Sequence, residues 1–118
     1  MVQKKINAKL PKKEILRGRG KFDYIFKEGK SISGDHTIIV YIESPEKKVG
    51  FVVSKKVKKA VQRNRFKRLL REIYRLNKFL FPDKYNYVLL AKGTSDNFNI
   101  LKDEIVALIK KIPKRDKP

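Results

Sequence analysis

The sequence predicts an α+β fold: a single domain, residues 1–118, with helices packed on a mixed β-sheet of about four strands in α-β-β-α-β-α order. Three observations support this prediction. A chain of 118 residues suits one domain with its own core. Hydrophobic residues make up 41% of it, including seven Phe and five Tyr, which is enough for a packed interior. Apolar residues recur with helical spacing in three segments and form short β-type runs in others.

The first predicted helix spans residues 21–28. Phe22, Ile25 and Phe26 stand at positions i, i+3 and i+4 and therefore share one face. The preceding residues, 1–13, are polar and basic, and we expect a flexible arm there.

Three runs of residues predict strands. Residues 36–42 (HTIIVYI) are apolar at nearly every position, which is typical of an interior strand covered on both faces. Turn-forming residues at 44–47 lead to a return strand at 49–53 (VGFVV), and residues 85–91 (YNYVLLA) form a third.

The last predicted helix follows Gly93, where Thr94 or Ser95 can cap its first turn. Its apolar residues keep helical spacing up to Ile112, and Pro113 ends the run. Residues 113–118 are expected to fray.

The charge of the chain is extreme, because 31 Lys and Arg face 12 Asp and Glu, a formal net charge of +19. Such self-repulsion in a compact domain indicates a polyanionic partner, first nucleic acid and second an anionic membrane surface.

The absence of Cys excludes disulfides and thiolate metal sites. No apolar run approaches the roughly 18 residues that span a bilayer, and no secretion signal is recognisable. We therefore expect a soluble cytoplasmic protein.

The longest predicted helix, residues 58–78, is basic on one side. Its apolar residues converge on one face: Phe66, Leu69, Leu70, Ile73, Leu76 and Leu80. The opposite face has Asn64, Lys67, Arg68, Arg71, Arg75 and Lys78. Residues 54–78 contain 11 basic residues and a single acid, Glu72. Ordinary solvated helix faces mix the two signs, so this stripe favours a binding surface over a solvated face or a disordered tail.

Arginine is concentrated in this helix, at positions 63, 65, 68, 71 and 75, which are five of the eight Arg in the chain. Guanidinium groups bind phosphate bidentately and stack on bases, which suits folded RNA. Asn64 can hold a 2′-hydroxyl, a base edge or a metal-bound water, or it can be a polar spacer.

The segment from Gly50 to Glu72, GFVVSKKVKKAVQRNRFKRLLRE, closely resembles the signature of the bacterial ribonuclease P protein subunit. The resemblance covers roughly residues 16–112 and includes FDYIF in the first helix. The most specific matches are Ser54-Lys55-Lys56, Ala60-Val61, Arg63-Asn64-Arg65, Lys67-Arg68 and Arg71. The resemblance implies a small basic protein that binds a catalytic RNA, whose holoenzyme removes the 5′ leader from precursor tRNA and requires magnesium. It also implies a left-handed β-α-β crossover through the basic helix, against a strong right-handed preference.

By this resemblance, the residues that contact or orient the RNA are Lys55, Lys56, Arg63, Asn64, Arg65, Lys67, Arg68, Arg71 and Arg75. A cleft between the sheet and the helices is implied for the leader, with Phe22, Phe26, Ile38 and Val40 as its candidate lining. The family often has aromatic residues on the first long strand, where this chain has Thr37 and Val40. Tyr41 faces away from Val40 by strand alternation, so the choice between Tyr41 and Val40 as a leader contact stays open.

No catalytic residues are predicted in the protein itself. The acids are scattered, and His36 beside Asp35 is expected to be a turn or strand-entry residue because neighbouring strand residues point to opposite faces. The resemblance therefore implies an endonuclease whose reaction centre lies in the RNA. It implies no metal or cofactor bound by the protein and no protein partner.

Three other functions are compatible with a basic chain of this size. A structural RNA-binding protein, such as a ribosomal protein, shares its charge but not the Arg63-Asn64-Arg65 context. A DNA-binding regulator would need a short helix before the basic one at helix-turn-helix spacing, and none is predicted. A membrane-surface helix would present an exposed apolar face, whereas here strands are available to cover it.

Overall fold

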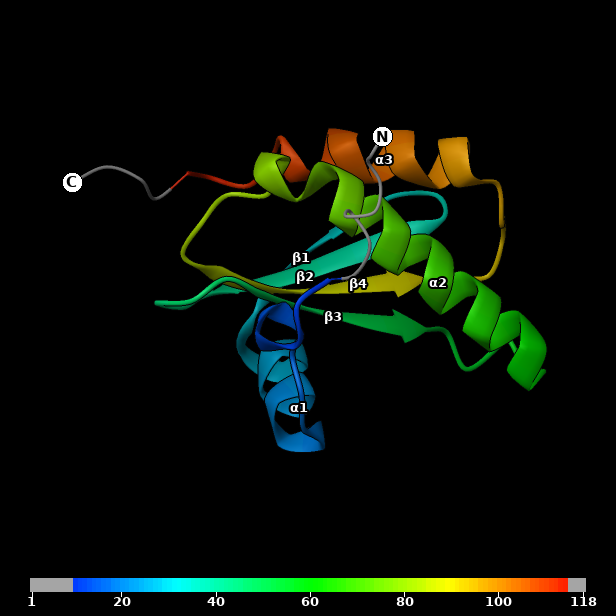
Figure 1. Cartoon of the computed structure of the whole chain (residues 1–118), viewed down its shortest axis with the longest axis horizontal. Helices are drawn as coiled ribbons and strands as arrows, with labels where there is room; N and C mark the ends of the chain where they lie inside the picture. The colour runs from blue at the N-terminus through cyan, green and yellow to red at the C-terminus, as the bar shows by residue number, and fades with distance from the viewer. Residues whose placement is uncertain (1–9, 115–118) are drawn as a thin grey trace.

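The computed structural model describes residues 10–114 and has the predicted α+β architecture (Figure 1). Its elements are, in chain order, the 3-10 turn η1 (Lys12–Glu14), α1 (Arg19–Glu28), β1 (Lys30–Ser33), β2 (Thr37–Glu43), β3 (Lys48–Val53), α2 (Ala60–Asn77), the 3-10 turn η2 (Lys78–Leu80), β4 (Tyr85–Ala91) and α3 (Phe98–Ile109).

The four strands form one mixed sheet in the order β1-β2-β4-β3. Strand β2 is antiparallel to both β1 and β4, whereas β3 and β4 are parallel neighbours. Helix α2 connects β3 to β4, which is the crossover that the resemblance implies. Strand β1 was not among the three predicted runs. Its sequence, KSIS, has one apolar residue and no β-type pattern, so only its pairing with β2 defines it.

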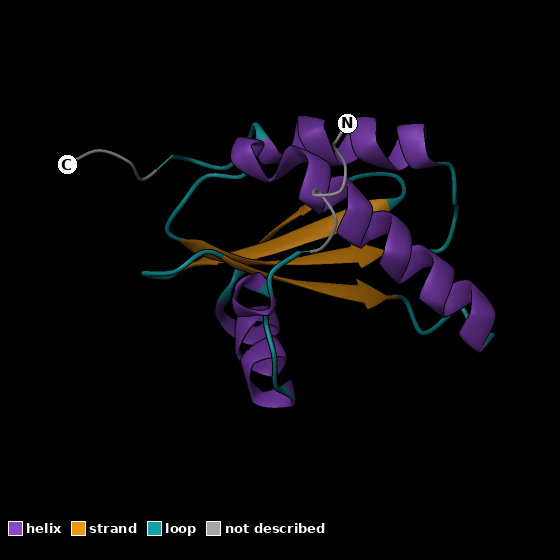
Figure 2. Ribbon diagram, in the orientation of Figure 1, coloured by secondary structure: helices purple, strands orange, loops and turns teal. Residues whose placement is uncertain are grey.

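The helices divide between the two faces of the sheet, with α2 and α3 on one face and α1 on the other (Figure 2). The larger core lies under α2 and α3. It contains an aromatic cluster in which the rings of Tyr74 and Phe81 are 4.8 Å apart and those of Phe81 and Tyr87 are 5.1 Å apart. Edge-to-face packing of this kind adds to the stabilisation that burial provides.

The smaller core lies under α1 and consists of Leu16, Ile25, Val40 and Val88. Strand alternation explains the division, because successive side chains point to opposite faces. Val40 therefore contacts the α1 side, whereas Tyr41 joins the larger core, where its ring lies 5.4 Å from that of Tyr85.

The start of α3 differs from the prediction. Asn97, not Thr94 or Ser95, caps the helix, and its side-chain oxygen accepts a hydrogen bond from the Ile100 N–H at 3.0 Å. The regular helix ends at Ile109, and Ile112 stays buried in the turn that follows.

The N-terminal arm also differs in the part that the structure describes. Leu10 is buried in the larger core, and η1 follows it, so these residues pack on the domain. The predicted arm at 1–9 and the end of the predicted tail at 115–118 lie outside the described residues. Within residues 10–114, no helix is long and apolar enough to cross a membrane.

Candidate RNA interface

Helix α2 turns a fully apolar side to the sheet. Phe66, Leu70 and Ile73 are buried, as their helical spacing predicts, and Tyr74 is buried with them. Leu76 and Leu80 were predicted for the same face but are 48% and 40% exposed, because the regular helix ends at Asn77. The opposite side faces solvent, with Asn64, Arg68 and Arg71 exposed and Lys67 half-buried. Among residues 10–114, no acid forms an ion pair with these three cations. This set, Asn64, Lys67, Arg68 and Arg71, is called the α2 basic face below.

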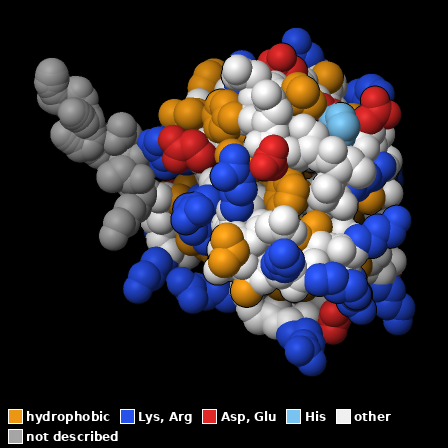
Figure 3. All heavy atoms as spheres, turned by 90° about the vertical axis from the view of Figure 1, so that its right-hand side faces the viewer, with side chains coloured by type: hydrophobic (Ala, Val, Ile, Leu, Met, Phe, Trp, Pro, Cys, Tyr) orange, Lys and Arg blue, Asp and Glu red, His pale blue; other side chains and the backbone are white. Residues whose placement is uncertain are grey.

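The loop between β3 and α2 extends this face with two exposed lysines, Lys55 and Lys56. The Ser54 hydroxyl accepts a hydrogen bond from the Lys56 N–H at 3.2 Å, which gives the loop a fixed turn. At this end of the molecule many Lys and Arg side chains surround smaller hydrophobic patches (Figure 3).

Arg63 points inward, unlike its neighbours. Its guanidinium donates hydrogen bonds to three backbone carbonyls, those of Ser54 at 2.9 Å, Val57 at 2.8 Å and Val53 at 3.2 Å. It therefore ties the end of β3 and the lysine loop to the first turns of α2. These bonds hold in place the loop that carries Lys55 and Lys56.

Two further arginines have acidic partners. The Nε of Arg65 lies 3.1 Å from a carboxylate oxygen of Asp96, across the gap between α2 and the loop before α3, and both side chains are well exposed. Arg75 pairs with Glu72 one turn earlier, and this hydrogen bonding raises the Arg75 pKa. The α2 basic face is thus flanked by arginines whose charge is already partly neutralised.

Arg71 has an aromatic partner instead of an acid. Its guanidinium carbon lies 5.6 Å from the centre of the Phe51 ring, a cation–π contact that leaves its hydrogen-bond donors available.

On the other side of the sheet, α1 covers one row of strand residues and leaves the next row accessible. The paired residues Val40, Val88 and Gly50 are all buried. An added Cβ at Gly50 would lie 2.4 Å from the Phe22 ring, so this glycine allows the ring to lie directly on β3. The adjacent row, Ile38, Leu90 and Val52, is only half-buried and is called the open row below.

The four residues predicted for the leader cleft all lie on this α1 side. Phe22 is half-buried, Phe26 is 44% exposed, Ile38 belongs to the open row and Val40 is buried. Val52 and Leu90 also belong to the open row, but the sequence did not predict this. Their placement beside Ile38 depends on the pairing of strands that are distant in the chain.

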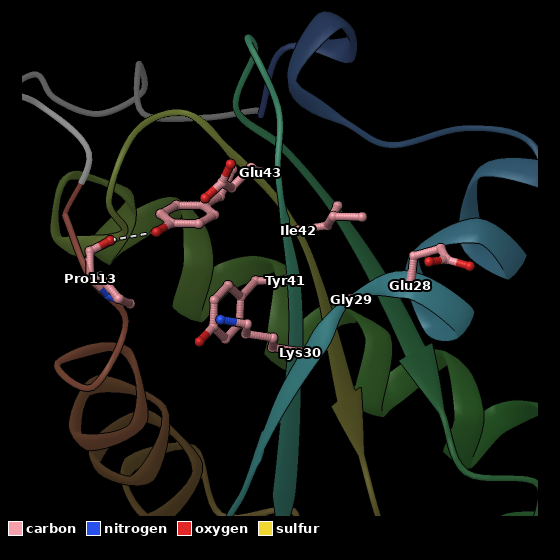
Figure 4. Close-up of a pocket in the computed structure, with 8 residues that line it drawn as sticks. Glu28, Gly29, Lys30, Tyr41, Ile42, Glu43 and Pro113 are labelled. Carbon is pink, nitrogen blue, oxygen red and sulfur yellow. Dashed lines mark hydrogen bonds between the residues drawn. The ribbon is translucent and has the colours of Figure 1, made fainter.

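A hollow that contains none of the predicted site residues lies at the end of the sheet where the rings of Tyr41 and Tyr85 are in contact (Figure 4). It measures about 360 Å³, and its lining includes Lys30 and Glu43. The Tyr85 hydroxyl donates to the Pro113 carbonyl at 2.7 Å. Within residues 10–114, no group of three His, Asp or Glu side chains could hold a metal ion.

His36 forms hydrogen bonds that fix the structure. Its Nδ1 lies 2.7 Å from the Thr94 hydroxyl, and its backbone N–H donates to the Glu104 carboxylate. Burial disfavours the charged form of Glu104, but hydrogen bonds from the Thr37 hydroxyl and from the two backbone N–H groups outweigh this and lower its pKa. The cluster joins α3 to the start of β2, as a strand-entry role for His36 predicts.

The fold and its surfaces define a basic α+β protein suited to a polyanion, with the α2 basic face on one side and a partly open sheet face on the other. The family model for ribonuclease P matches residues 10–113, and the chain belongs to this family as a bacterial ribonuclease P protein component, the protein part of that endonuclease.

Individual relatives agree with this assignment. The chain is 36% identical over 107 residues to the ribonuclease P protein component of Dictyoglomus thermophilum, a match that covers 86% of this chain and 89% of that one. It is 33% identical over 109 residues to the component from Thermotoga maritima, covering 86% and 93%.

Solved structures show the same fold. The ribonuclease P protein from Thermotoga maritima superposes with a TM-score of 0.76 at 31% identity, covering 85% of this chain and 98% of that one. The Staphylococcus aureus protein gives a TM-score of 0.72 at 20% identity, covering 82% and 93%, which supports the fold alone.

Proposed function

We propose that this chain binds the catalytic RNA of ribonuclease P through the α2 basic face and the lysine loop, and that it holds the 5′ leader of precursor tRNA on the α1 side of the sheet. In this proposal the RNA provides the reaction centre and binds the magnesium that cleavage requires. The protein neutralises phosphate repulsion and positions the leader. It would act in the cytoplasm, where tRNA precursors are processed.

The observation that supports RNA binding most strongly is the set of cations on α2 without an acidic partner among residues 10–114. Lys67, Arg68 and Arg71 repel one another within about one helical turn, which costs stability that a phosphate backbone would restore. Asn64 adds a neutral donor and acceptor among them, which suits a 2′-hydroxyl or a base edge.

The leader proposal is supported by the arrangement on the α1 side. Phe26, on α1, is partly exposed, and the open row of the sheet is only half-buried, so both leave apolar groups accessible on the α1 side. Single-stranded nucleotides stack on such surfaces with little regard to sequence, because every base has a π-face. Leaders of varied sequence would therefore be accepted.

The test adds the protein to a bacterial ribonuclease P catalytic RNA and measures leader removal from precursor tRNA at low magnesium. We expect strong stimulation, because the protein replaces part of the counterion charge, and no cleavage by the protein alone. Absence of stimulation would overturn the proposal and favour a structural RNA-binding role.

A further inference from the structure

A small apolar surface lies just beyond the C-terminal end of α2. Phe79, in η2, is 79% exposed, and Leu76 and Leu80 are 48% and 40% exposed. Phe79 and Leu80 line one hollow, and Leu76 lies in the last turn of α2 just before them. Single exposed apolar residues are common, but an adjacent group that includes a bare aromatic ring indicates a binding surface. Leu76, Phe79 and Leu80 are called the end patch below.

The backbone beneath the end patch is fixed. The Lys47 ammonium donates to the carbonyls of Lys78 at 2.8 Å and Phe81 at 2.5 Å. These two bonds fix the first residue of η2 and the residue that follows the turn. The Lys78 ammonium lies 3.0 Å from the Glu14 carboxylate. Phe81, two residues after Phe79, is buried against Tyr74. Phe79 is therefore held outward by a rigid turn rather than exposed by a frayed helix end.

The end patch lies in and directly after the last turn of α2, the helix that presents the α2 basic face. Phe79 and Leu80 line a hollow of about 440 Å³ together with Lys47, Asp83 and Lys114. Lys47 is paired with Asp83 and donates to two backbone carbonyls, which leaves Lys114 as the cation of this lining for a phosphate. An exposed aromatic ring with a lysine close by suits a single-stranded nucleic acid.

We propose that the end patch binds an unpaired nucleotide of the catalytic RNA, with its base stacked on the Phe79 ring and its phosphate near Lys114. Leu76 and Leu80 would contact the edge of the same nucleotide. This inference rests on the proposed function, since it adds a base-stacking contact at the far end of the helix that binds the RNA through charge.

The size and charge of the surface favour a nucleotide over a second copy of the chain. Three partly exposed side chains of this kind offer on the order of 300 Å², whereas a stable dimer needs roughly 800 Å² on each partner. Two chains with a net charge of +19 each would also repel one another.

The experiment measures the affinity of the catalytic RNA, without tRNA, for the wild type and for Phe79→Leu and Phe79→Tyr variants over a range of salt. We expect Phe79→Leu to weaken binding by about fivefold or more, the loss of one stacked base. Phe79→Tyr should stay within about twofold of the wild type, since the ring is kept. The salt slope should not change, because no charge is removed. Ile100→Ala is the matched control, because Ile100 is also an exposed apolar residue but lies in α3.

A second arm replaces Phe79 with p-benzoylphenylalanine and irradiates the complex. A crosslink to a nucleotide of the catalytic RNA supports the proposal. Crosslinks to residues 1–9 of the same chain or to a second copy would overturn it in favour of those occupants, as would wild-type affinity for Phe79→Leu. The variants Lys67→Ala, Arg68→Ala and Arg71→Ala are measured alongside. If these three variants lose affinity while Phe79→Leu does not, only the end patch fails. If none of them changes the affinity, the proposed function fails as well.

Discussion

The two faces of the sheet differ in how completely they are covered. Under α2 and α3, the strand residues Ile39, Val49, Tyr87 and Leu89 are almost fully buried, and aromatic rings fill the space between helix and sheet. Under α1 only the row of Val40, Val88 and Gly50 is buried, and the open row beside it is half-buried. The first face is therefore the main source of stability, whereas the second leaves apolar surface accessible, which is where the proposed function places the leader.

The first prediction compares equivalent truncations on the two faces. Leu70→Ala removes a fully buried side chain from the larger core and should lower the free energy of unfolding by about 2–5 kcal/mol. Ile38→Ala, in the open row, should cost less, about 1–2 kcal/mol, because part of that side chain is already in water. Denaturant unfolding measures both. Equal losses would contradict the proposed difference between the faces.

The second prediction concerns the closest approach of α1 to the sheet. Gly50→Ala places a methyl group where the Phe22 ring now lies, so the ring must move away from β3. We expect a loss of about 1–3 kcal/mol in stability, the usual cost of overpacking. Val52→Ala on the same strand and face is the matched control and should cost less. A Gly50→Ala protein as stable as the wild type would show that Phe22 is free to shift.

The third prediction separates two arginines of α2. Arg63→Ala leaves three backbone carbonyls without their donor and should destabilise the protein by about 1–3 kcal/mol. Arg68→Ala should leave stability within about 0.5 kcal/mol and reduce the log–log salt slope of RNA binding by roughly 0.7–0.9. Thermal unfolding and salt titrations distinguish them. An unchanged slope for Arg68→Ala would assign RNA binding to another surface.

The fourth and smallest effect is the pH dependence that Glu104 introduces. Because its pKa is lowered in the folded state, its contribution to stability is present above its ordinary pKa of 4.5 and is lost as the pH falls through the lower folded value. At neutral pH the wild type should therefore have a higher free energy of unfolding than Glu104→Gln, and this difference should become smaller in acid. A difference that stays constant from pH 7 to about 3 would contradict a stabilising ionised Glu104.

The sequence was sufficient to predict the elements whose signal is local. The spacing of Phe66, Leu70 and Ile73 fixes which side of α2 is buried, and β-type runs identify three strands. Strand β1 was missed because KSIS has no such run and exists only through its pairing with β2. The Asn97 cap was missed because Thr94 and Ser95 are equally good caps, and only the direction of the loop decides among them.

The candidate site was predictable to the same extent. The exposed positions of Asn64, Arg68 and Arg71 follow from the helical spacing alone. The inward turn of Arg63 does not, because its three acceptors belong to β3 and to the loop after it. The open row joins residues from three strands, so it appears only once the strand order β2-β4-β3 is known.

The most direct test of the division between the two surfaces is the ratio of the holoenzyme's dissociation constants for mature and precursor tRNA. It is measured with saturating protein for the wild type, Phe26→Leu and Arg68→Ala. Phe26 is partly exposed on α1, on the side of the sheet proposed for the leader, so loss of its ring should lower the preference for precursor by about fivefold or more, the equivalent of one stacked base. Arg68→Ala should leave the ratio unchanged once the complex has formed. A ratio that falls for Arg68→Ala and survives in Phe26→Leu would contradict the account and assign the leader to α2.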